Sequence, residues 1–147
     1  MIRRIKEFRR KLLRLFKLRP IHKVIRLLKK HDFLCMNSTL EVFGRDGDYH
    51  SLDYIDHVKK FEIWEIDPKF EGKLKENFPT ATVKITDSYK EIRSVDKTYD
   101  TIIIDNHQGL FADKCEHFEI IKDCLQKLND KGVIITNVMP DVSINPY

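Results

Sequence analysis

The stretch from Leu40 to Pro68 constrains the fold more than any other part of this chain, and it reads LEVFGRDGDYHSLDYIDHVKKFEIWEIDP. A short apolar run leads into a Gly-Arg-Asp-Gly turn, a helical segment follows, and a second apolar run ends at a carboxylate. This order predicts a βαβ unit, in which a helix crosses between two parallel strands. In folds of this kind, the first βα turn and the end of the second strand form a crevice for a nucleotide.

The same rhythm of strand and helix continues to the end of the chain. Apolar, β-branched runs predict five strands, at residues 39–43, 61–66, 81–85, 99–105 and 133–138. Helices are predicted at residues 21–31, 49–59, 68–77, 88–92 and 113–128. We therefore predict an α/β, Rossmann-like, mostly parallel five-stranded sheet with flanking helices and right-handed crossovers.

Several local details follow from this reading. Asp48 and Asp113 are predicted to cap the helices that they precede. On the helix at 21–31, the predicted buried side is Val24, Ile25, Leu27 and Leu28, and on the last helix it is Phe118, Ile121, Leu125 and Leu128. The fifth strand is apolar, so we expect a second subunit, the tail at 140–147 or the N-terminal helix to cover its edge.

The totals favour one globular domain rather than a disordered or membrane-spanning chain. The 147 residues are 41% hydrophobic and 34% charged, and no apolar run is long enough to cross a bilayer. The three cysteines are odd in number and none has CxxC spacing, which argues against a disulfide framework or a zinc module. With no signal peptide visible after the basic start, we expect a cytoplasmic protein.

The positive charge is concentrated at the N-terminus. Residues 1–19 hold nine Lys and Arg and one acid, Glu7, so residues 20–147 carry −4 although the chain as a whole carries +4. We divide the chain into a basic amphipathic helix at 1–19 and an α/β domain at 20–147. The helix is expected to pack on the domain or a partner subunit; peripheral contact with an anionic membrane is the alternative. We expect no nucleic-acid partner.

Carboxylates mark the candidate site. Glu41 lies within the first strand, and Glu65, Asp87 and Asp105 lie at the carboxyl ends of later strands, where an open α/β sheet binds its ligands. Glu65 comes 21 positions after Gly44, a spacing that suits hydrogen bonds to a ribose diol. The alternative is that these acids are only solvated strand ends.

The motifs around these acids resemble those of class I S-adenosylmethionine-dependent methyltransferases over roughly residues 20–140. LEVFGRDG resembles the glycine-rich first motif, WEIDP the second, ITDSY the third, YDTIIIDNHQG the fourth, and LNDKGVIITN the turn and strand that follow. The resemblance implies S-adenosylmethionine as cofactor. It places Glu41 at the acidic position of the first motif, Glu65 on the ribose, Asp87 on the adenine and Asp105 near the transferred group. A weaker resemblance, to spermidine synthases, rests on GRDG and EID.

Two departures from the family pattern stand out. The usual acid-x-Gly-x-Gly-x-Gly spacing would place glycines at 43, 45 and 47, but here Phe43, Arg45 and Gly47 occupy these positions and Gly44 is displaced by one. Phe43 and Arg45 would either crowd the methionine part of the cofactor, or Arg45 would pair with its carboxylate. The family fold also has two further strands after the fifth, so the resemblance implies a short or truncated member.

Histidines supply the candidate general base. His107, two residues beyond Asp105, could accept a proton from an acceptor hydroxyl. His50, Asp53 and His57 could share one helix face, but a single face without further ligands is a weak metal site, and we expect no metal.

The leading hypothesis is therefore an S-adenosylmethionine-binding protein that transfers a methyl group to a small-molecule or glycan hydroxyl. The Gly44–Gly47 loop would hold the methionine part, with Asp105 and His107 near the acceptor. The alternatives are a non-catalytic scaffold or dimerisation module and an aminopropyltransferase-like protein. We expect a homo-oligomer, because the apolar edge of the fifth strand needs a cover.

Overall fold

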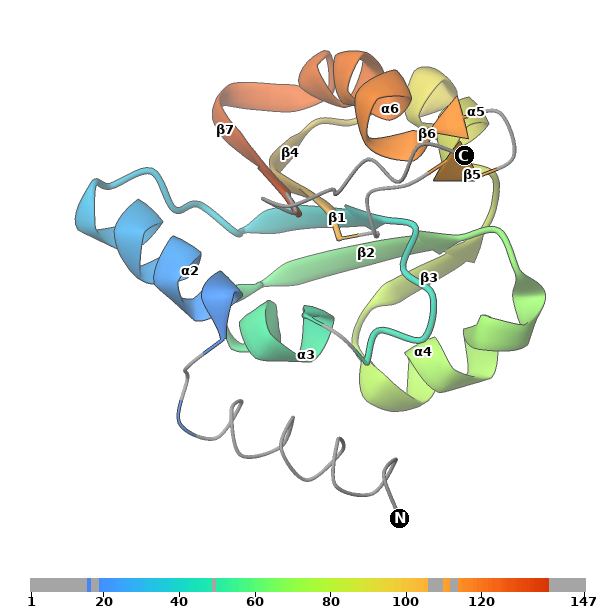
Figure 1. Cartoon of the computed structure of the whole chain (residues 1–147), viewed down its shortest axis with the longest axis horizontal. Coiled ribbons are helices and arrows are strands. Elements are labelled where there is room, and N and C mark those ends of the chain that lie inside the picture. The colour runs from blue at the N-terminus through green and yellow to red at the C-terminus, as the bar shows by residue number, and fades with distance from the viewer. Residues whose placement is uncertain (1–15, 17–18, 49, 106–109, 112–113, 138–147) are drawn as a thin grey trace, which may run out of the picture.

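The computed structural model describes residues 16, 19–48, 50–105, 110–111 and 114–137. At its centre is a sheet of five parallel strands in the order β3-β2-β1-β4-β7 (Figure 1). The strands are β1 (Ser38–Val42), β2 (Lys60–Glu65), β3 (Thr82–Ile85), β4 (Tyr99–Ile104) and β7 (Leu128–Thr136). The five predicted strands and the α/β fold class are confirmed. The predicted helix at 1–19 lies outside the described residues apart from Phe16 and Arg19, and so does the tail at 140–147.

Helices cover both faces of the sheet. On one face lie α2 (Pro20–Lys30), α3 (Ser51–Tyr54) and α4 (Glu71–Asn77), and on the other lie α5 (Ser88–Ser94) and α6 (Glu116–Leu125) (Figure 1). Short 3₁₀ turns at Ile55–His57 and Pro68–Phe70 extend α3 and precede α4. A two-stranded hairpin, β5 (Leu110–Phe111) and β6 (Lys114–Cys115), precedes α6.

The alternation of side chains along the strands builds two apolar cores. Ile63 and Ile103 pack toward α2, α3 and α4, with Ile25, Tyr54 and Phe78. On the opposite face, the strand residues Leu40, Val42, Trp64, Ile102 and Ile104 pack with Ile92, Ile120 and Cys124. Because every central strand is buried on both faces, the carboxyl edge of the sheet is where polar side chains can meet a ligand.

Two predicted helix faces are wrong in part. On α2 the buried residues are Ile21, His22 and Ile25, whereas Val24 is 38% and Leu27 59% exposed. On α6, Ile120 and Cys124 are buried, and Phe118 and Leu125 are exposed. In both helices the apolar residues outnumber those that one face can bury, so the direction of packing decided which were covered.

The segment after the turn also differs from the prediction. The helix begins at Ser51 and is a single turn of α-helix followed by a 3₁₀ turn, rather than a helix over 49–59. The N-cap residue is His50 and not Asp48, whose carboxylate accepts a hydrogen bond from the side chain of Asn77 on α4 (3.0 Å). This hydrogen bond ties the turn to α4.

The last two elements are shifted relative to their predicted bounds. α6 begins at Glu116 and not after Asp113, which lies outside the described residues. β7 begins at Leu128, five residues before the predicted strand at 133–138. The register of its pairing with β4 shifts between the pairs Tyr99–Leu128 and Thr101–Val133, so residues 129–132 form an irregular part of the strand. β7 is the last strand on its side of the described sheet, and what covers its edge stays a prediction.

Within the part of the chain that the structure describes, none of the helices has the length and apolar character that crossing a bilayer requires.

Candidate functional site

The loop after β1 has a left-handed backbone at three alternate positions. Phe43 has a φ of 62°, Arg45 of 46° and Gly47 of 66°. These are the three positions at which the methyltransferase spacing has glycine. A left-handed conformation costs a residue with a Cβ roughly 1–2 kcal/mol, so Phe43 and Arg45 are both held against their own preference. The loop therefore keeps the path of a glycine-rich loop without two of its glycines.

Close packing explains the two glycines that are present. A Cβ on Gly44 would lie 2.2 Å from Ile63 Cγ2 on β2, and a Cβ on Gly47 would lie 2.3 Å from the ring of Phe78. The Gly44 N–H donates to the carbonyl of Trp64 (2.9 Å), and the Gly47 N–H donates to that of Gly44 (2.9 Å). The absence of a side chain at Gly44 and Gly47 thus lets the loop pack closely against β2 and the end of α4.

Glu65, predicted to bind ribose, holds the same loop from the end of β2. One carboxylate oxygen accepts the backbone N–H of Arg45 (2.6 Å) and the other that of Asp67 (2.8 Å). Glu65 is only 4% exposed. A carboxylate oxygen can accept two hydrogen bonds, so Glu65 retains acceptor capacity for a diol while anchoring the loop.

Asp87 lies at the same edge, one strand further out. It caps α5 by accepting the backbone N–H of Tyr89 (3.0 Å). The Tyr89 ring lies 5.6 Å from the ring of Phe43, and the N–H of Thr86 donates to the carbonyl of Glu65 (2.8 Å). The structure therefore brings together the loop Phe43–Gly47, Glu65 and Asp87, which we call the β1–β3 edge.

Glu41, predicted at the acidic position of the first motif, is buried below the loop. It is 2% exposed and accepts hydrogen bonds from the hydroxyls of Ser51 (2.7 Å) and Tyr54 on α3. Burial raises the pKa of Glu41 from 4.5 to about 8; the two hydrogen bonds oppose this and the charge of Asp105 adds to it. At neutral pH Glu41 is therefore mostly protonated, and it joins β1 to α3.

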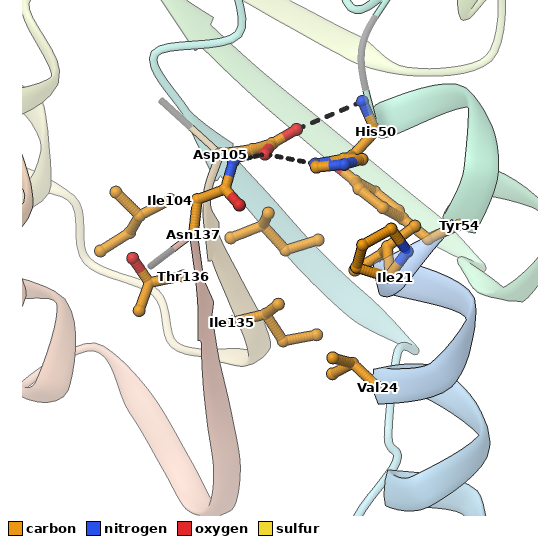
Figure 2. Close-up of a pocket in the computed structure, with 11 residues that line it drawn as sticks. Ile21, Val24, His50, Tyr54, Ile104, Asp105, Ile135, Thr136 and Asn137 are labelled. Carbon is orange, nitrogen blue, oxygen red and sulfur yellow. Dashed lines mark hydrogen bonds and ion pairs between the residues drawn. The ribbon is translucent and has the colours of Figure 1, made fainter. Parts of the chain in front are cut away.

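Asp105 meets two side chains that come from distant parts of the chain (Figure 2). Its Oδ1 lies 2.7 Å from His50 Nδ1 and accepts a hydrogen bond from Asn137 Nδ2 (3.0 Å), and its Oδ2 accepts the His50 N–H (3.3 Å). We call Asp105, His50 and Asn137 the Asp105 cluster. His107, predicted as the base beside Asp105, lies outside the described residues.

A cavity of about 260 Å³ lies against the Asp105 cluster, between α2 and the carboxyl ends of β4 and β7 (Figure 2). Its walls are largely apolar and include Ile21 and Val24 of α2 and Ile135 of β7, whereas Tyr54 lines it from α3. We call it the α2–β7 pocket. Since Val42 of β1 is paired with Ile104 of β4, the loop after β1 and Asp105 leave the sheet on neighbouring strands.

Sequence reasoning missed two members of the Asp105 cluster. The sequence groups His50 with Asp53 and His57 as a weak metal site, but in the structure the three contact different partners: Asp105, Arg19 and Lys29, respectively. Over the described ranges there is no group of three His, Cys, Asp or Glu that could hold a metal ion. Asn137 follows the fifth strand, so the strand-end rule that selected Glu65 and Asp105 would have found it had amides been considered.

Comparison with known proteins connects this geometry to one fold. No model of a known protein family matches the sequence, and a search of curated proteins found no significant match. Solved structures do match. An S-adenosylmethionine-dependent methyltransferase from Clostridium acetobutylicum aligns over 90% of this chain with a TM-score of 0.64 at 12% identity. The chain has the fold of the class I S-adenosylmethionine-dependent methyltransferases.

Two further solved methyltransferase structures also align with this chain. An rRNA methylase from Streptococcus thermophilus covers 80% of this chain with a TM-score of 0.56 at 16% identity. A methyltransferase from Thiobacillus denitrificans, solved in complex with S-adenosylhomocysteine, covers 70% with a TM-score of 0.51 at 15% identity. The chain spans 56%, 70% and 42% of the lengths of these three proteins. The shared part is the parallel sheet with its flanking helices.

Proposed function

We propose that the protein binds S-adenosylmethionine at the β1–β3 edge and transfers its methyl group to a small-molecule acceptor. The observation that carries this proposal is the left-handed backbone at Phe43, Arg45 and Gly47. Strain of this kind persists where the surrounding structure enforces it, and it concentrates at functional sites. A chain that needed only a turn between β1 and α3 would gain nothing from two strained side chains.

The donors and acceptors at the β1–β3 edge suit this cofactor. Glu65 has acceptor capacity for the ribose hydroxyls, and the carboxylate of Asp87 can accept from the adenine amino group. Arg45 is exposed, so its guanidinium can pair with the methionine carboxylate. When bound, S-adenosylmethionine supplies an electrophilic methyl group on a sulfonium; the chain has to position donor and acceptor and accept a proton.

The first experiment is calorimetric titration of the folded protein with S-adenosylmethionine and S-adenosylhomocysteine. We expect micromolar binding of both. Glu65→Ala removes the ribose acceptor and one anchor of the loop, so we expect its affinity to fall at least tenfold, the loss of about one charge-assisted hydrogen bond. Glu76→Ala removes an exposed carboxylate from α4 and serves as the matched control, with unchanged affinity.

If the folded wild-type protein gives no heat of binding with either ligand, the proposal is overturned and the scaffold or dimerisation module is favoured. That module further requires a stable oligomer in sedimentation velocity, and a monomer at micromolar concentration would contradict it.

A second titration separates methyl from aminopropyl transfer. Decarboxylated S-adenosylmethionine lacks the carboxylate that we assign to Arg45. Arg45→Ala should therefore weaken S-adenosylmethionine by about two- to fivefold, the range of one exposed ion pair, and leave the decarboxylated donor unaffected. Equal losses for both donors would contradict the role of Arg45. Tighter wild-type binding of the decarboxylated donor would favour aminopropyl transfer.

A further inference from the structure

Exposed apolar side chains gather on and around α2. Seven large apolar side chains are exposed among the described residues, and four of these lie within residues 16–33: Phe16, Val24, Leu27 and Phe33. Leu27 is 59% exposed on α2, and Phe33 is 60% exposed shortly after the helix ends. Single exposed apolar residues are ordinary, whereas a group of them marks an interaction site.

Basic side chains surround Leu27 on the outward side of α2. The spacing of Lys23, Arg26, Leu27 and Lys30 places all four on one side of the helix, opposite the buried Ile21, His22 and Ile25. Lys23, Arg26 and Lys30 are exposed, and none of them forms an ion pair with another described residue. We call Lys23, Val24, Arg26, Leu27, Lys30 and Phe33 the α2 surface.

The charge of this region differs in sign from that of the rest of the domain. Residues 20–33 hold four Lys and Arg and one acid, Asp32, so they carry +3. Residues 34–147 hold 14 Lys and Arg against 21 Asp and Glu, so they carry −7. The preceding segment, 1–19, carries +8, so α2 continues a positively charged stretch of the chain.

We propose that the α2 surface binds an anionic lipid bilayer, with Leu27 and Phe33 inserted at the level of the headgroups. Anionic headgroups complement the cations, and the interfacial layer takes up the exposed apolar side chains. A second copy of this chain is disfavoured, because two α2 surfaces would bring like charges together. Single-stranded RNA is disfavoured because its bases stack on aromatic rings, whereas the exposed apolar side chains of α2 itself are aliphatic.

The location of α2 is compatible with the proposed cofactor site. In Figure 1, α2 lies at the left, away from α4 and α5 at the right, and the β1–β3 edge adjoins those two helices. Val24 also lines the α2–β7 pocket, so the α2 surface borders that pocket. The proposal does not depend on cofactor binding, and a failure to bind S-adenosylmethionine would leave it unchanged.

The cations can be tested by co-sedimentation of the full chain with vesicles of phosphatidylcholine that contain about one-third phosphatidylserine. Each Lys or Arg near such a surface contributes about fivefold in affinity, so removing three should weaken binding about 100-fold. The test variant is the triple Lys23→Gln, Arg26→Gln and Lys30→Gln. The matched control removes the same charge from exposed positions on α4, α5 and β7 and should lose less than about threefold: Lys75→Gln, Lys90→Gln and Lys131→Gln.

The apolar side chains need a separate test. Leu27→Gln combined with Phe33→Gln should weaken vesicle binding by about tenfold or more, because less apolar surface is buried in the interface. Leu125→Gln combined with Phe118→Gln is the matched control on α6, where the side chains are 58% and 72% exposed, and it should bind like the wild type.

Insertion itself can be observed by fluorescence. Leu27→Trp should be quenched by lipids brominated on their acyl chains, whereas Leu125→Trp should not. Trp64, the one tryptophan of the natural chain, is buried and contributes equally to both variants.

Four results would overturn the proposal: no binding of the folded wild-type protein to the vesicles, equal losses in the two triple variants, equal losses in the two double variants, or equal quenching of the two introduced tryptophans. Binding of a uridine oligonucleotide that is lost in the α2 triple variant, with no binding to vesicles, would overturn it in favour of RNA.

Discussion

The loop Phe43–Gly47 and the interior below it lie next to each other and are built in opposite ways. The loop keeps a path that two of its residues disfavour, and its glycines are pressed against Ile63 and Phe78. In the interior, the carboxyl oxygens of Glu41 accept hydrogen bonds from two hydroxyl groups of α3. The first region holds its shape through close packing and the second through buried hydrogen bonds. Substitutions in the two regions should therefore fail in different ways.

The largest expected effect is at Gly47. Gly47→Ala adds a Cβ 2.3 Å from the Phe78 ring at a φ of 66°, so overpacking of about 1–3 kcal/mol adds to backbone strain of about 1–2 kcal/mol. We expect the free energy of unfolding, measured in urea, to fall by about 2–5 kcal/mol. Gly72→Ala is the matched control: nothing lies within 4 Å of its Cβ, and on α4 it should gain about 0.5–1 kcal/mol. A loss at Gly47 no greater than 1 kcal/mol would show that the loop adapts.

Glu41 tests the interior region through pH. Its pKa is raised to about 8 in the folded protein from 4.5, so the folded state binds more protons between these values and stability falls as pH rises. The contribution is fully present below about pH 4.5 and lost above about pH 8. We expect the free energy of unfolding to drop by about 2–4 kcal/mol between pH 5 and 8.

Glu41→Gln is the comparison that isolates this group. The amide has the shape of the neutral acid and does not titrate, so urea unfolding of the variant should be nearly independent of pH over the same range. If wild type and variant share one pH profile, Glu41 is ionised in the folded protein and the assigned pKa is wrong.

The smallest expected effect returns to the strained loop. Arg45→Gly removes the strain of a left-handed residue with a Cβ, which is about 1–2 kcal/mol. Glycine also raises the entropy of the unfolded chain, so we expect the free energy of unfolding to rise by only about 0.5–1 kcal/mol. Arg45→Ala loses the same side chain and keeps the strain, so it should gain nothing. Thermal unfolding of the pair decides this: equal midpoints would show that the backbone at position 45 is not strained.

The difference between the two regions also explains what could be predicted from the sequence. The left-handed conformation at Phe43 and Arg45 could be foreseen only through the family spacing, because neither residue favours it. The burial of Glu41 could not be foreseen, since its partners Ser51 and Tyr54 follow it by 10 and 13 positions across an irregular turn.

The sequence by itself determined the five strands, their separation by helices and the acids at their carboxyl ends. These depend on local patterns: β-branched runs, turn residues and polar residues where a run stops. The parallel arrangement followed because a crossover helix returns the chain to the same edge of the sheet. Glu65 and Asp87 were therefore correctly expected at one edge with the Gly44–Gly47 loop.

Only the tertiary structure decided which side chains meet. His50 and Asp105 are 55 positions apart and Asp105 and Asn137 are 32 apart, and no local pattern relates them. The buried sides of α2 and α6 were likewise decided by the sheet against which they pack. The end of a strand places a residue at the edge of the sheet. Which side chain that residue then contacts depends on the pairing of β1 with β4 and of β4 with β7, and long-range packing selects this pairing.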